Sequence, residues 1–181
     1  DHTRVPMLAS LPGRFEGGRR CERLANLVDL MPTMLSAAGA DTSGLSLDGE
    51  DLSDVLTGAT DRDAVHIQYR PGEYGNYTTI TDDWKYTYSA PDQKEFLFDR
   101  KNDPEETRNA AGDEAAQPVL KQLRDRTIAW LRDGGEAEAL DGDQFKQYPI
   151  KRMPDDPNEG LIAQDRPGYT LDLPGYTDDD N

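Results

Sequence analysis

The chain has 181 residues, a formal net charge of −16 and a sequence pI of about 4.4. Nucleic-acid binding is not expected, because phosphate contacts need clustered basic side chains and acidic residues outnumber basic ones by 36 to 20. No membrane contact is expected, since no apolar run approaches the roughly 18 residues of a membrane span. The single cysteine, Cys21, can form neither an internal disulfide nor a zinc site alone.

The composition favours the end of a larger protein over a complete domain. Only 35% of the residues are hydrophobic and the mean hydropathy is −0.85, so a large self-sufficient core is not expected. The chain starts at Asp1 rather than at methionine, and its first apolar run comes too early for another element to precede it. We therefore expect a missing N-terminal part of the same protein to complete the fold.

Residues 4–13 read R-V-P-M-L-A-S-L-P-G, an apolar run bounded by proline and glycine. Such a run predicts a strand of a buried sheet, with Pro6 near its start, where a missing N–H is tolerated. A helix is expected next, because Asp29 has the side chain of an N-cap, Pro32 falls in the first turn and Gly39 provides a stop. One apolar face of this helix is predicted to pack in the core, formed by Leu30, Met31, Met34, Leu35 and Ala38.

The carboxylate-rich stretch at 45–58 reads L-S-L-D-G-E-D-L-S-D-V-L-T-G. It does not match the calcium loop of an EF-hand, which needs glycine at its sixth position and glutamate at its twelfth. A turn at Asp48-Gly49 followed by a short helix is predicted instead. The side chains expected to face inward from this helix are Leu52, Val55 and Leu56.

From residue 64 the apolar pattern changes from helical to alternating. Short runs rich in threonine and tyrosine predict four strands, at residues 65–69, 77–81, 85–89 and 95–99. Tight connections between the last three favour an antiparallel meander. Its apolar face needs a cover, which a helix over residues 119–132 provides, with Pro118 before it and Gly134 after it.

These elements predict an α/β core remnant followed by an α+β subdomain, in which a small four-stranded antiparallel sheet is covered by one long helix. Residues 1–60 would hold the last strand and the helices of the core. Residues 61–135 would form the sheet-and-helix subdomain. Residues 136–181 are rich in proline and aspartate and show little periodicity, which predicts an irregular, extended tail.

No complete catalytic set is visible in the sequence. The G-x-S-x-G, phosphate-loop and C-x-x-C patterns are all absent. His66 alternates with Val65 and Ile67 on a predicted strand, so a half-exposed structural role is favoured over catalysis. Asp1-His2 has the chemistry of a metal-binding pair, but the sequence places no further carboxylates beside it. We therefore predict neither catalytic nor metal-binding residues in this chain.

The loop over residues 69–76, Y-R-P-G-E-Y-G-N, is the best candidate for a binding function. It joins two predicted strands, and Tyr69, Arg70 and Tyr74 supply one guanidinium and two aromatic rings. Such groups recognise anions by charge-assisted hydrogen bonds and sugar-like rings by stacking. We predict these three side chains as substrate-binding residues, with an ordinary solvated loop as the alternative.

Five short segments, taken in order, resemble the C-terminal end of the sulfatases, which belong to the alkaline-phosphatase-like superfamily. They are R-V-P-M-L with the following P-G, V-D-L-M-P-T-M-L-S-A-A-G, L-D-G-E-D-L, D-D-W-K-Y-T-Y and F-L-F-D-R-K-N-D-P-E-E-T-R-N-A-A. Each segment is short, but their joint order spans residues 4–132 and makes the resemblance fairly specific. The segment Q-Y-R-P also resembles one found in sulfatases that act on sulfated sugars.

The resemblance implies that the complete enzyme hydrolyses sulfate esters, with a formylglycine nucleophile and a calcium ion held upstream of R-V-P. Cys21 does not match the formylglycine signature, because E-R-L-A follows it, and Asp1-His2 lacks the glycine that follows in the family's metal-binding segment. The chain alone is therefore expected to be inactive and to bind neither cofactor. Its expected partners are the missing N-terminal catalytic part and an anionic sulfated small molecule or sugar.

Two alternatives stay open at the level of sequence. A phosphonate or phosphodiester hydrolase of the same superfamily shares this ending and differs in its upstream metal ligands. A non-catalytic acidic binding module, made of the small sheet and its helix, belongs to a different class of protein. The residues upstream of Asp1 would separate the hydrolases, since a C/S-x-P/A-x-R motif marks the formylglycine enzymes.

Overall fold

A computed structural model describes residues 3–134 and 136–149 of the chain. The described residues up to Tyr148 form one compact unit by their contacts, and it holds all the helices and strands given below. The predicted tail from residue 150 onward lies outside the described residues. Within the described part, no helix is long and apolar enough to cross a membrane.

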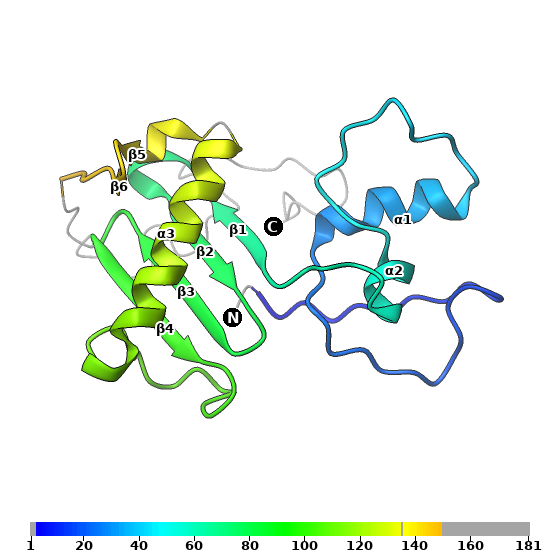
Figure 1. The fold of residues 1–181 in the computed structure, drawn as a ribbon, viewed down its shortest axis with the longest axis horizontal. Helices are drawn as coiled ribbons and strands as arrows, with labels where there is room; N and C mark the ends of the chain where they lie inside the picture. The colour runs from blue at the N-terminus through cyan, green and yellow to red at the C-terminus, as the bar shows by residue number, and fades with distance from the viewer. Residues whose placement is uncertain (1–2, 135, 150–181) are drawn as a thin grey trace, which may run out of the picture. The chain divides into compact units, whose positions relative to one another are not determined.

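A four-stranded antiparallel sheet confirms the predicted meander, with the strands in chain order (Figure 1). Its strands are β1 (Val65–Tyr69), β2 (Asn76–Ile80), β3 (Trp84–Ser89) and β4 (Lys94–Asp99). Threonine and tyrosine are frequent in β2 and β3, because branched and aromatic side chains fill a pleated surface well. In the centre of the sheet, Thr78 lies opposite Thr87, and their hydroxyl oxygens are 2.8 Å apart.

The long helix α3 (Gln117–Asp133) covers one face of this sheet (Figure 1). It follows the short 3-10 turn η3 (Glu114–Ala116), and a proline stands in its first turn as predicted. Thr127 is fully buried and its hydroxyl lies 2.6 Å from that of Thr79 in β2, which satisfies two polar groups inside the core. The apolar side chains between helix and sheet include Tyr77, Tyr86, Tyr88, Leu97, Leu120, Leu123, Ile128 and Leu131.

Two short helices precede the sheet, α1 (Leu30–Ala37) and α2 (Leu52–Thr57). A 3-10 turn, η1 (Leu27–Asp29), leads into α1, and the N-cap of that turn is Asn26. Asp29 occupies the N-cap position of α1 as predicted, but its side chain makes no capping hydrogen bond to the amides of α1. Helix α2 agrees with expectation at its buried residues Leu52 and Val55, whereas Leu56 is 37% exposed.

The carboxylate of Asp29 forms a buried ion pair with Arg62. Its side chain is fully buried, and the guanidinium of Arg62 donates to both of its oxygens, at 2.5 and 2.8 Å. The backbone amides of Asn26 and Glu50 also donate to it, at 2.6 and 2.9 Å. Burial alone would raise the pKa of Asp29, but these donors hold it below its ordinary value. The pair therefore ties α1 and the approach to α2 to the residues that lead into β1.

Two predictions for residues 1–60 are not met in the described structure. Residues 4–10 form no strand and pair with no strand of the described sheet, so their backbone hydrogen bonds are not made within a sheet. Leu8 is fully exposed as a result. The apolar face of α1 is also uncovered, since Met31 is 59% and Met34 64% exposed, while Pro32 and Thr33 face inward.

Residues 137–148, which composition assigned to the tail, pack on the sheet. They form the turn η4 (Ala137–Ala139) and a small hairpin of β5 (Leu140–Asp141) and β6 (Gln144–Phe145). The Phe145 ring is only 6% exposed and stacks on Tyr88 with 4.0 Å between ring centroids. One buried aromatic side chain thus holds a segment that has little periodicity of its own.

The buried ion pair gives a stability prediction. Asp29→Asn should lower the free energy of unfolding by about 3 kcal/mol, because Arg62 would stay buried without its carboxylate. Urea titration followed by circular dichroism measures this loss. Glu22→Gln is the matched control: it breaks the exposed pair between Arg20 and Glu22 and should change stability by less than about 0.5 kcal/mol. Equal stability of wild type and Asp29→Asn would contradict the assignment.

Candidate functional site

The predicted substrate-binding residues lie on and beside the β1–β2 loop (residues 70–75). Tyr69 ends β1, and Tyr74 ends the short 3-10 turn η2 (Gly72–Tyr74). Arg70 adopts a left-handed backbone conformation with φ of 58°, which is uncommon for a residue other than glycine. The loop is closed by two backbone hydrogen bonds, from Gly75 to Gly72 at 3.0 Å and from Ala90 to Gly75 at 2.9 Å. The loop therefore has a defined shape.

The side chains of this loop face solvent as a binding role requires. Tyr69 is 54% and Tyr74 44% exposed, and the guanidinium carbon of Arg70 lies 5.5 Å from the centroid of the Tyr69 ring. That spacing fits a cation–π contact, which orients the guanidinium beside the ring. Arg70 makes no salt bridge to any residue in the described ranges. Its charge is available to an anion from outside.

The base of the loop is rigid. The Tyr77 side chain is 1% exposed and lies directly under Gly75, where a Cβ atom would collide with the tyrosine ring. Burial raises the pKa of the Tyr77 hydroxyl to about 12, so the side chain stays neutral. The same ring stacks on Phe145 with centroids 6.1 Å apart. Only glycine lets the chain pass this close to Tyr77 on its way from Tyr74 into β2.

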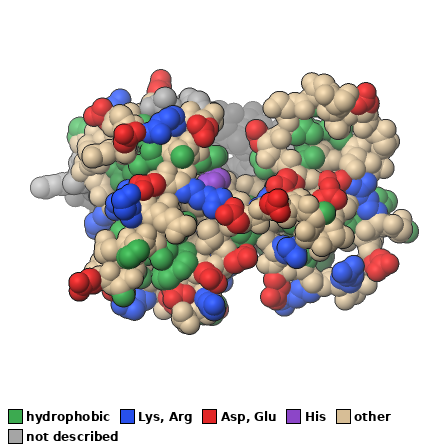
Figure 2. All heavy atoms as spheres, viewed as in Figure 1, with side chains coloured by type: hydrophobic (Ala, Val, Ile, Leu, Met, Phe, Trp, Pro, Cys, Tyr) green, Lys and Arg blue, Asp and Glu red, His purple; other side chains and the backbone are tan. Residues whose placement is uncertain are grey.

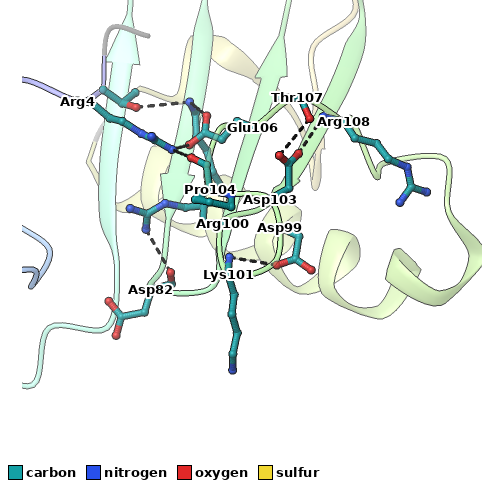
Figure 3. Close-up of polar contacts among 12 residues, drawn as sticks. Arg4, Asp82, Asp99, Arg100, Lys101, Asp103, Pro104, Glu106, Thr107 and Arg108 are labelled. Carbon is teal, nitrogen blue, oxygen red and sulfur yellow. Dashed lines mark hydrogen bonds and ion pairs between the residues drawn. The ribbon is translucent and has the colours of Figure 1, made fainter.

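The acidic loop after β4, residues 99–108, is built by turn and ion-pair chemistry (Figure 3). The Asp99 carboxylate accepts the amide of Lys101 at 3.1 Å, and Asp103 accepts the amide of Arg108 at 2.9 Å. Both side chains serve the backbone of their own loop.

Glu106 is the exception in that loop, because its carboxylate points back to the sheet. It lies 2.5 Å from the Lys85 ammonium and 3.1 Å from the Arg4 guanidinium (Figure 3). Burial alone would raise the pKa of Glu106, but Lys85 and then Arg4 hold it below its ordinary value. Arg4 also contacts the Pro104 carbonyl. This pair of bridges fixes the start of the chain beside β3.

Neither cofactor that the sulfatase resemblance implies fits the described residues. No group of three or more His, Cys, Asp or Glu side chains in the described ranges is placed to hold a metal ion. Cys21 is exposed and has none of the sequence context of a formylglycine precursor. No chemical step on this chain is therefore assigned to calcium or to formylglycine.

His66 takes a structural position, as expected. Its ring stacks on Trp130 of α3 at a centroid distance of 5.0 Å, and its Nδ1 lies 2.9 Å from the Thr79 hydroxyl. Burial, followed by the positive charge of Arg126, lowers the pKa of His66 to about 4, while Asp63 opposes the shift. Figure 2 shows the described histidine in purple within a surface of mixed charge. At neutral pH it is an uncharged part of the α3 packing.

Comparison with known proteins identifies the family. The model of the family described as N-sulphoglucosamine sulphohydrolase, C-terminal, matches residues 1–133, which is most of the chain. This chain belongs to that sulfatase C-terminal family. This match confirms the resemblance seen in the ordered sequence segments. The match gives no information about catalytic residues upstream of this chain.

Relatives of this sulfatase family support the assignment. Arylsulfatase K of Xenopus laevis is 29% identical over 136 residues, covering 66% of this chain and 25% of the relative. A protein solved in complex with its substrate D-glucosamine-2-N,6-O-disulfate has a TM-score of 0.50 at 25% identity, covering 65% of this chain and 25% of that one. A phosphonate monoester hydrolase of Silicibacter pomeroyi shares the fold, with a TM-score of 0.57 at 20% identity, covering 79% and 32%. The chain thus spans about a quarter of the length of Arylsulfatase K.

His66 gives a pH prediction for this sulfatase chain. Its pKa is about 4 in the folded state and near 6.5 when unfolded, so the unfolded state binds the proton more tightly. Its contribution to stability is therefore complete above pH 6.5 and is lost as the pH falls from 6.5 through 4. His66→Gln should remove this dependence between pH 4.5 and 6.5, measured by urea unfolding at several pH values. An unchanged slope in the variant would contradict a buried neutral His66.

Proposed function

We propose that this chain is the C-terminal part of a sulfatase that hydrolyses sulfate esters of sugars, and that the β1–β2 loop borders the substrate pocket. Membership of the sulfatase C-terminal family supports the class of reaction. A structural relative whose substrate is a disulfated glucosamine supports a sulfated sugar as ligand. The observation that carries the role of the loop is the exposed Arg70 guanidinium, which has no carboxylate partner among the described residues.

Arg70 is one of the exposed arginines without a carboxylate partner in the described residues, as are Arg19 and Arg23. Arg62, Arg124 and Arg126 each donate to a nearby carboxylate, in a protein whose net charge is −16. Such paired guanidinium groups are neutralised, whereas Arg70 can offer two parallel N–H groups to a sulfate or a sugar carboxylate. Tyr69 lies beside it and presents a ring face to a pyranose. Together they can bind and orient an anionic sugar.

The proposal assigns catalysis and substrate binding to different parts of the protein. In this proposal the nucleophile and the metal site belong to an N-terminal catalytic part, and this chain alone does not hydrolyse sulfate esters. Residues 1–60 pack against that part and residues 61–135 form the subdomain at the pocket. Exposed apolar side chains support the packing role, because Leu8, Met31 and Met34 are uncovered in the described structure.

A phosphonate ester is the second candidate substrate class. The phosphonate monoester hydrolase of Silicibacter pomeroyi shares the fold of this region, and phosphonate and sulfate monoesters both present an anion to a guanidinium. Assays of the complete enzyme with p-nitrophenyl sulfate and p-nitrophenyl phenylphosphonate would separate the two. A kcat/KM that is higher for the phosphonate ester by about tenfold or more would replace the sulfatase assignment.

Substitution of Arg70 tests the loop. In the complete enzyme, Arg70→Ala should raise the KM for a sulfated glucosamine about tenfold and leave kcat within about twofold, since it removes a charged contact that binds the ground state and the transition state alike. Steady-state kinetics at several substrate concentrations measure both constants.

The controls use the same chemistry. Arg70→Lys keeps the charge but not the fork, and should give an intermediate KM. Arg20→Ala removes an exposed arginine that is paired with Glu22, and should leave both constants unchanged. An Arg70→Ala enzyme with wild-type KM and kcat would remove the loop from the substrate pocket.

A further inference from the structure

The residues that follow α3 return to the sheet beside the β1–β2 loop. We call residues 136–148, which include η4 and the β5–β6 hairpin, the hairpin segment. Its turn η4 contacts η2 in the loop, and a Cβ atom added at Gly72 would lie 3.9 Å from the Tyr148 hydroxyl. The hairpin segment lies beyond residues 1–133, the part matched by the sulfatase family model. A segment outside that match therefore contacts the loop that carries Arg70.

Phe145 joins the hairpin segment to aromatic side chains of the sheet. Tyr77 of β2 and Tyr88 of β3 are cross-strand partners, and the Phe145 ring stacks on both, with ring planes within 8° and 9°. The three side chains are 1%, 4% and 6% exposed for Tyr77, Tyr88 and Phe145. Buried rings packed in this way have few alternative positions, because a close-packed interior leaves little free volume.

Tyr77 transmits this packing to the loop. Its ring and hydroxyl lie directly under Gly75, where any Cβ atom would collide with them. Burial raises the pKa of the hydroxyl and the nearby Gly72 amide opposes the rise, yet the hydroxyl has no hydrogen-bond partner among the described residues. The loop is therefore held on Tyr77 by packing, and its position depends on what keeps the Tyr77 ring in place.

A second connection runs through the β3–β4 turn, residues 90–93. The Gln93 side chain donates to the Tyr148 carbonyl, and the Ala90 amide donates to the Gly75 carbonyl at 2.9 Å. Within the hairpin segment, the Tyr148 hydroxyl donates to the Glu138 carbonyl at 3.0 Å. The turn is thus hydrogen-bonded both to the loop and to the hairpin segment.

We propose that the hairpin segment holds the β1–β2 loop in the shape that presents Arg70 to the substrate, with Phe145 as the positioning residue. This inference rests on the proposed function of the loop. Phe145 does not touch the substrate in this role: its ring supports Tyr77, and Tyr77 supports the loop at Gly75. A guanidinium displaced by about 1 Å loses the geometry of a two-pronged contact with an anion.

Hydrogen exchange of the complete enzyme tests the support directly. Phe145→Ala should speed exchange in the peptide that covers residues 70–76 by about tenfold, because the loop would open locally more often. Leu120→Ala is the matched control, since Leu120 is 3% exposed in the same core but lies about 20 Å along α3 from the end at which the hairpin segment follows. It should leave exchange in this peptide at the wild-type rate.

Steady-state kinetics of the same enzyme test the link to Arg70. Phe145→Ala should raise the KM for a sulfated glucosamine about fivefold, with kcat within about twofold of wild type. The KM for p-nitrophenyl sulfate, which has no sugar to reach the loop, should not change. In an Arg70→Ala background, Phe145→Ala should add no further rise, because both substitutions remove the same contact. Phe145→Leu should give a smaller rise, and it replaces the alanine variant if that variant does not fold.

Four results would overturn the inference. One is wild-type exchange of residues 70–76 in folded Phe145→Ala, and another is an equal acceleration or KM rise in Leu120→Ala, which would indicate general loosening. A third is an additional KM rise when Phe145→Ala is combined with Arg70→Ala. The fourth is a wild-type KM in Phe145→Ala while Arg70→Ala raises it, which would leave the proposed function intact. A wild-type KM in Arg70→Ala itself would instead remove the proposed function, and this inference with it.

Discussion

The buried contact between Asp29 and Arg62 is the interaction on which the arrangement of the described chain depends. The first sixty residues contain two short helices and long irregular connections, which cannot bury enough apolar surface to hold a position alone. A carboxylate with no exposed surface, met by one guanidinium and two backbone amides, fixes their geometry instead. The cost of burying both charges is offset only because nearly every lone pair of Asp29 has a donor.

Two loops each contain a residue in the left-handed backbone conformation, and the side chains of these two residues point in opposite directions. Arg70 and Glu106 both have positive φ, at 58° and 54°. Glu106 turns its carboxylate inward to Lys85 and Arg4 and so completes a scaffold. Arg70 turns its guanidinium outward, beside Tyr69. Strain of this kind persists only where the surroundings enforce it.

The sheet and α3 could be predicted from the sequence because their signals are local. Alternating threonine and tyrosine runs with tight turns specify a meander, and α3 carries a broad apolar stripe. The features that could not be predicted depend on distant partners. No local sequence pattern around Asp29 predicts its pairing with Arg62, thirty-three residues later. The packing of Phe145 likewise depends on Tyr88 and Tyr77 rather than on any pattern in its own segment.

The residues of the candidate site could also be selected from the sequence, although their role could not. Tyr69, Arg70 and Tyr74 could be selected from the composition of the loop. The structure shows two exposed rings there and a guanidinium that forms no salt bridge with the residues it describes. Their role in substrate binding stays a prediction.

The order of the strands in the sheet has a consequence for how the protein folds. Each strand of the sheet pairs with the strand next to it in the chain, so every pairing closes a short loop. Contacts of this kind form quickly, because little chain entropy is lost before the first hydrogen bonds are made. The meander and α3 occupy one continuous stretch of chain, so this layer can assemble from its own residues as they are synthesised. The helices before it are then joined to it by a few contacts, among them Arg62 with Asp29 and Arg4 with Glu106.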